Sequence, residues 1–122
     1  MLRIFFLVST LFLSVNLMGA DERITSTVET RTLELIGQGL SGKEAEHFAR
    51  QMVFLESTAP KDFVFNRGQK TIREEYFELY MQCAILEIKI NAAIRKSAGK
   101  VEDSSLLIMA AKELEYEVAA GR

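Results

Sequence analysis

The residues best suited to bind a metal ion are Glu44 and His47, which lie three positions apart. On a helix this spacing lets a carboxylate and an imidazole reach one ion, as in di-iron bundles, where a second pair and further glutamates complete the site. Glu78 could supply another carboxylate, but His47 is the only histidine, so the second pair is missing. We therefore predict no metal and no cofactor. Glu44, His47 and Glu78 remain the residues of an alternative, a metal- or small-ligand-binding helical bundle.

Cys83 is the only cysteine and the other residue with distinctive chemistry. It lies in an apolar run, where a thiolate is disfavoured, so we predict a small buried side chain and not a nucleophile. The alternatives are an intermolecular disulfide or a reactive thiol. The sequence contains no phosphate-binding glycine loop, haem attachment motif or nucleophile elbow. These observations predict a protein that is not an enzyme.

Four amphipathic segments must position these residues. Apolar side chains recur every three or four positions in each segment, which predicts helices. Two begin at capping boxes, Ser41–Glu44 and Thr71–Glu74, and glycines end the first and the third. The predicted ranges are about 22–36, 41–56, 72–98 and 104–119.

These segments predict an all-α fold, a small helical bundle of three to four helices. The long central helix 72–98 is expected to form an antiparallel hairpin with 104–119, because the link between them is short. Its apolar arc is wide, which predicts a place at the centre of the bundle or contact with a partner. On the last helix we expect the exposed side to be charged, with Lys112, Glu113, Glu115 and Glu117.

Residues 1–20 have the order of a secretory signal peptide. Arg3 precedes the apolar run 4–18, and Gly19 and Ala20 are small. The apolar run is short for a membrane span, which needs roughly 20 residues. We predict cleavage after Ala20, leaving 21–122 as a single helical domain. The alternative is a membrane-tethered structural subunit with an uncleaved anchor, and membrane contact is expected only if this segment is retained.

Composition limits the classes of partner. The chain has 15 Lys and Arg against 17 Asp and Glu, a net charge of −2, so no basic surface for nucleic acid is expected. With one cysteine, an internal disulfide is impossible. The exported domain must then be stabilised by helix packing or by a partner.

We therefore expect an exported small helical binding or accessory protein of the bacterial cell envelope, periplasmic or secreted. A secretion-apparatus accessory, an inhibitor or immunity protein and a chaperone-like protein all fit this description. A protein partner is expected, and a homo-oligomer remains an alternative. The predicted partner-binding residues are Phe63, Phe65, Tyr76 and Tyr80, because aromatic side chains anchor interfaces. Phe63 and Phe65 would point the same way in an extended connector, which could instead be a lid over one end of the bundle.

Overall fold

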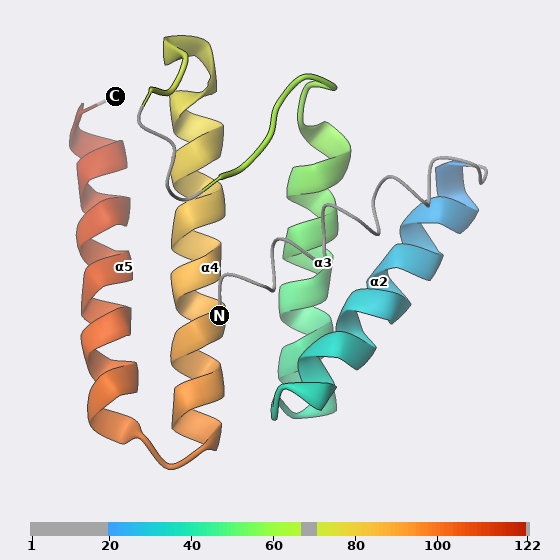
Figure 1. Cartoon of the computed structure of the whole chain (residues 1–122), viewed down its shortest axis with the longest axis vertical. Helices are drawn as coiled ribbons and strands as arrows, with labels where there is room; N and C mark the ends of the chain where they lie inside the picture. The colour runs from blue at the N-terminus through green and yellow to red at the C-terminus, as the bar shows by residue number, and fades with distance from the viewer. Residues whose placement is uncertain (1–19, 67–70, 122) are drawn as a thin grey trace. The chain divides into compact units, whose positions relative to one another are not determined.

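The structure is a computed structural model of the chain, and it describes residues 20–66 and 71–121, with side chains from Thr27 onward. The regular structure of this part is entirely helical, which confirms the predicted all-α class. The elements are α2 (Ala20–Gly37), α3 (Gly42–Thr58), the 3₁₀ turn η1 (Glu74–Tyr76), α4 (Phe77–Ser97) and α5 (Val101–Gly121) (Figure 1). Residues 1–19 of the predicted signal peptide lie outside the described residues. None of the described helices is long and apolar enough to span a membrane.

The chain divides into two compact units, Met1–Thr58 and Ala59–Arg122. Each contains one helical hairpin: α2 contacts α3 in the first unit, and α4 contacts α5 in the second. In both hairpins the two helices run in opposite directions from a short link (Figure 1). The antiparallel hairpin predicted for the last two helices is therefore present, and the prediction of a single domain over 21–122 stays a prediction.

Gly39 ends α2, as the sequence predicts. Its φ of 110° lies in the left-handed region, where a side chain is unfavourable. The Leu40 N–H donates to the Leu35 carbonyl at 3.2 Å, and the Gly39 N–H donates to the Ile36 carbonyl at 3.0 Å. This is the Schellman pattern, in which two terminal carbonyls of the helix find donors. Leu35 and Leu40 are both buried, so the turn is fixed from the apolar side as well.

Gly99 ends α4 by the same device. Its φ is 84°, the Lys100 N–H donates to the Arg95 carbonyl at 2.8 Å, and the Gly99 N–H donates to the Lys96 carbonyl at 3.0 Å. The chain then turns directly into α5, which starts at Val101. The predicted start near residue 104 is therefore late. Ser104 is buried, and its N–H already donates to the Lys100 carbonyl at 3.0 Å.

Replacing Gly99 with Ala is expected to destabilise the α4–α5 hairpin by about 1 kcal/mol, because an L side chain is strained at positive φ. No atom lies within 4 Å of the Cβ that alanine would add, so strain is the only cost. Gly37→Ala is the matched control, because Gly37 has equal space and no positive φ. Urea denaturation should show a loss only for Gly99→Ala. Equal stability of the two variants would contradict the assignment.

The two predicted capping boxes have different outcomes. At α3 the Ser41 Oγ accepts from the Glu44 N–H at 3.2 Å, which confirms the serine half of the first box. The second, at Thr71–Glu74, is wrong as the start of α4. The backbone at Arg73 is extended, with φ −61° and ψ 136°, and it is followed by η1; α4 begins at Phe77, without a side-chain cap.

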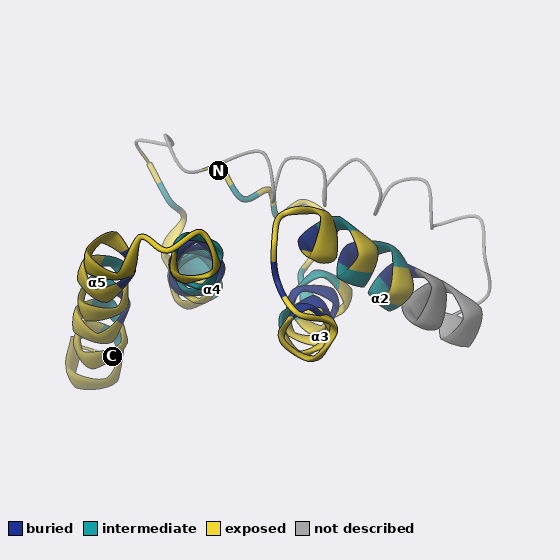
Figure 2. Ribbon diagram, turned by 90° about the horizontal axis from the view of Figure 1, so that it is seen from below, coloured by how far each residue is buried: buried dark blue, intermediate teal, exposed yellow. Residues whose placement is uncertain are grey.

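The core of each hairpin lies between its helices. In the second unit Ile85 and Ile88 of α4 pack with Ala111 of α5. Cys83, as predicted, is buried. Helix α4 is thus buried over most of its circumference, while α5 is exposed over most of its own (Figure 2). The first unit buries six apolar side chains along α2, the turn and α3: Leu35, Leu40, Ala45, Ala49, Met52 and Val53.

Candidate interaction surface

The four predicted partner-binding residues form two aromatic pairs. The ring of Phe63 meets that of Tyr76 edge to face, with centroids 5.7 Å apart, and Phe65 lies against Tyr80 at 5.1 Å. Two residues of the connector, two positions apart, therefore contact two tyrosines that are four positions apart. Val64, between the two phenylalanines, is exposed. Each phenylalanine thus contacts a tyrosine near the start of α4, and the role of the four residues as partner anchors stays a prediction.

A polar cluster fixes this connector to the start of α4. Asp62 accepts from the hydroxyl of Tyr76 at 2.5 Å and from Arg73 Nη1 at 3.2 Å. The guanidinium of Arg73 also lies 5.0 Å from the centre of the Tyr76 ring, a cation–π distance. These contacts reach from residue 62 to residues 73 and 76, so they set the backbone there in place of the predicted cap. The result is the tight 3₁₀ turn before α4.

Asp62 also controls the ionisation of Tyr76. The hydrogen bond from the phenol lowers the pKa of Asp62 and raises the pKa of Tyr76, because it stabilises the carboxylate and the neutral phenol together. In Asp62→Asn we expect the pKa of Tyr76 to fall towards its ordinary value. The measurement is tyrosinate absorbance against pH, with Tyr76→Phe identifying the contribution of Tyr76. An unchanged titration in Asp62→Asn would refute the contact.

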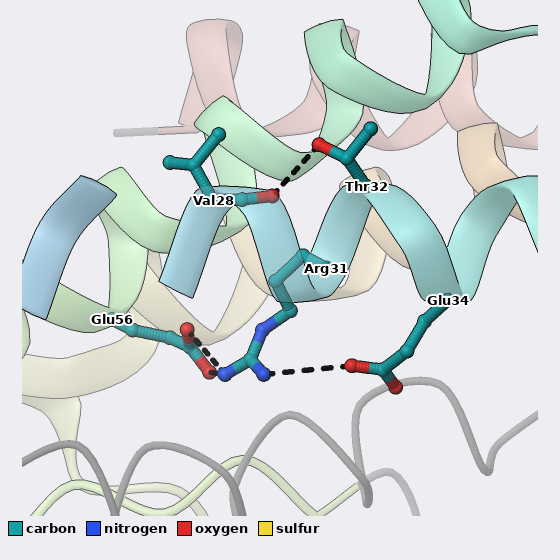
Figure 3. A network of polar contacts seen from close by, with 5 residues as sticks. All are labelled: Val28, Arg31, Thr32, Glu34 and Glu56. Carbon is teal, nitrogen blue, oxygen red and sulfur yellow. Dashed lines mark hydrogen bonds and ion pairs between the residues drawn. The ribbon is translucent and has the colours of Figure 1, made fainter. Parts of the chain in front are cut away.

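A buried ion pair joins the helices of the first unit. Arg31 of α2 has a fully buried side chain, and its Nη2 donates to both carboxylate oxygens of Glu56 of α3 at 2.9 Å (Figure 3). Its Nη1 lies 3.8 Å from Glu34 Oε1, one turn further along α2. Burial raises the pKa of Glu56 to about 7, opposed by the positive charge of Arg31. This pair connects the two helices of the hairpin, and no local sequence signal predicts it.

The metal-ligand candidates lie in different units. Glu44 and His47 are exposed on α3, and Glu78 is on α4. His47 Nε2 lies 3.3 Å from the side-chain nitrogen of Gln51, and the backbone N–H of Glu44 is engaged by Ser41. Among the described residues, no three His, Cys, Asp or Glu side chains are grouped to hold a metal ion.

Large apolar side chains lie exposed along the outer side of α5. Leu106, Met109 and Tyr116 are 64%, 58% and 75% exposed. The residues of α5 that pack towards α4 occupy other positions: Leu107, Ala111, Leu114 and Val118. We call the exposed line the outer seam and define it as Glu102, Leu106, Met109, Glu113, Tyr116 and Ala120.

Only the charged residues of α5 were predicted to be exposed. Lys112, Glu113, Glu115 and Glu117 are exposed as expected, and Glu115 pairs with Lys89 of α4 at 3.0 Å. The exposure of Leu106, Met109 and Tyr116 was not predicted. The signal was present as a second periodicity, because the outer seam repeats at intervals of 4, 3, 4, 3 and 4. The buried line of the same helix has its own helical spacing, so spacing alone does not show which line faces the core.

The chain was compared with protein families, curated proteins and solved structures. No family model, no curated protein and no solved structure matches the chain. We therefore infer function from the chain's own residues and their geometry.

Proposed function

We propose that this protein is an exported accessory protein of the bacterial cell envelope, periplasmic or secreted, that acts by binding another protein. The outer seam of α5 carries the proposal. Large apolar side chains that lie exposed together on one side of a helix mark sites of interaction. Here three large apolar side chains share one side of a helix whose other side is packed against α4.

The geometry favours the outer seam over the aromatic pairs as the main contact. Phe63, Phe65, Tyr76 and Tyr80 are each half-buried, because their rings already cover one another. Side chains at the centre of an interface contribute most when binding removes them from water. Leu106, Met109 and Tyr116 have more surface left to bury, so they can contribute more on binding.

Export is supported by the residue order of the first twenty positions. The intact mass of the chain recovered from its native cell tests it. A chain beginning at Asp21 is the expected result. A mass that includes residues 1–20 would favour the membrane-tethered subunit instead.

Protein binding is tested by photocrosslinking of the full chain in the cell that produces it. A photoreactive residue is placed singly at Met109, Phe54 or Val64, which are exposed on α5, α3 and the connector. We expect an adduct of one defined mass from at least one position, lost when an excess of the untagged chain competes. If none of the three positions gives a discrete adduct while the chain remains folded, the proposed function is wrong.

A further inference from the structure

The outer seam of α5 has the repeat of a coiled-coil interface. Apolar residues that recur at alternating intervals of three and four keep one line of a helix facing a partner helix. Leu106, Met109, Tyr116 and Ala120 occupy four of the six places of this line, from Glu102 to Ala120. A second helix is therefore the shape that fits the seam.

Glu113 occupies a place within the seam itself. It lies four residues after Met109 and three before Tyr116, so a helix docked on this line would cover its carboxylate. Covering a charge without a partner is costly, and an opposite charge on the facing helix offsets the cost. The charges beside the seam include Asp103 and Glu117, with Lys112 on the other flank, so the surface is acidic on balance.

From this pattern we infer that the outer seam binds an amphipathic helix of another protein that places Lys or Arg opposite Glu113. The inference rests on the proposed function and specifies the chemistry of the partner. Apolar residues of that helix would contact Leu106, Met109 and Tyr116. Its cations would meet the carboxylates in and beside the seam, which sets register and partner choice in coiled coils.

A second copy of this chain fits the same surface poorly. In parallel pairing Glu113 would face its own copy, and like charges at a seam repel. In an antiparallel pair centred on the middle of the seam, Glu113 would face Met109 of the other chain. Its carboxylate would then be covered without a cation opposite it. An anionic lipid surface is disfavoured as well, because the carboxylates would be repelled by it.

The test uses two synthetic helical peptides of the length of α5, with leucine along the seam. One carries lysine opposite Glu113 and beside the seam, and the other carries glutamate at the same places. We expect fluorescence anisotropy to show that the full chain binds the lysine peptide at least about tenfold more tightly, with affinity falling as salt rises. Glu113→Lys should reverse this preference. Glu29→Lys, the same charge change at an exposed position of α2, should leave it unchanged.

Two further variants separate the apolar contribution from general attraction to acidic surface. Leu106→Ala and Tyr116→Ala should each weaken binding of the lysine peptide by about tenfold or more, with thermal unfolding unchanged because both side chains are exposed. Equal binding of the two peptides, or no response to Glu113→Lys, would overturn the inference. A dimer in sedimentation that Tyr116→Ala converts to monomer would overturn it too, since the seam would then bind a second copy.

The crosslinking experiment separates failure of this inference from failure of the proposed function. Adducts from Phe54 or Val64 but none from Met109, together with no peptide binding, would refute the basic helix and retain the protein-binding role. An absence of adducts at all three positions would refute both.

Discussion

Replacing Arg31 with alanine is expected to destabilise the α2–α3 hairpin by about 3–5 kcal/mol near pH 8. Arg31 is among the largest fully buried side chains, so its removal leaves a cavity between the helices. It also leaves the carboxylate of Glu56 without the guanidinium that donates to both of its oxygens. Urea denaturation followed by helical circular dichroism measures the loss.

Arg31→Met separates the two contributions, because methionine retains most of the buried volume but carries no charge. It should restore the part of the loss that is due to packing. Both variants should lose less near pH 5, because Glu56 then takes up a proton and no longer needs a cation, given that burial raises its pKa to about 7. A loss below about 1 kcal/mol for Arg31→Ala at both pH values would show that the pair does not hold the hairpin.

The helices could be predicted wherever their signals are local. The Ser41 hydroxyl and the Glu44 N–H that it caps are three residues apart, and the Gly39 and Gly99 turns use donors and acceptors within one turn of chain. The start of α4 could not be predicted in this way. Thr71–Glu74 has the residues of a capping box, but Asp62, more than ten residues earlier, binds Arg73 and Tyr76 and imposes a different turn. A tertiary contact thus outweighed a local propensity.

The candidate sites follow the same division. Arg31 and Glu56 are 25 residues apart, and nothing near either residue indicates the other, so only the folded hairpin brings them together. Residue type identifies the four aromatic side chains as candidates for contacts. It does not show that they contact one another in pairs. The outer seam differs from both, because its spacing is visible in the sequence. Two lines of helical spacing share α5, and only packing against α4 shows which line is buried.

The stability of the α2–α3 hairpin is expected to fall as pH rises from about 4.5 to about 7, because of Glu56. Its carboxyl has a pKa near its ordinary value of 4.5 in the unfolded chain and of about 7 in the folded hairpin. The folded state therefore binds the proton more tightly, so this contribution is complete below about pH 4.5 and is lost once pH exceeds about 7.

The size of this change follows from the pKa difference, which corresponds to about 3 kcal/mol between the two limits. The charged groups that face Glu56 from α2 are Arg31, which opposes the shift, and Glu34, which adds to it. Urea denaturation of the full chain across this pH range measures the slope, and Glu56→Gln should flatten it. The contribution of Glu56 is the difference between the pH slopes of the wild-type chain and Glu56→Gln. If wild-type stability rises with pH relative to Glu56→Gln, attraction to Arg31 outweighs the cost of burying the carboxylate.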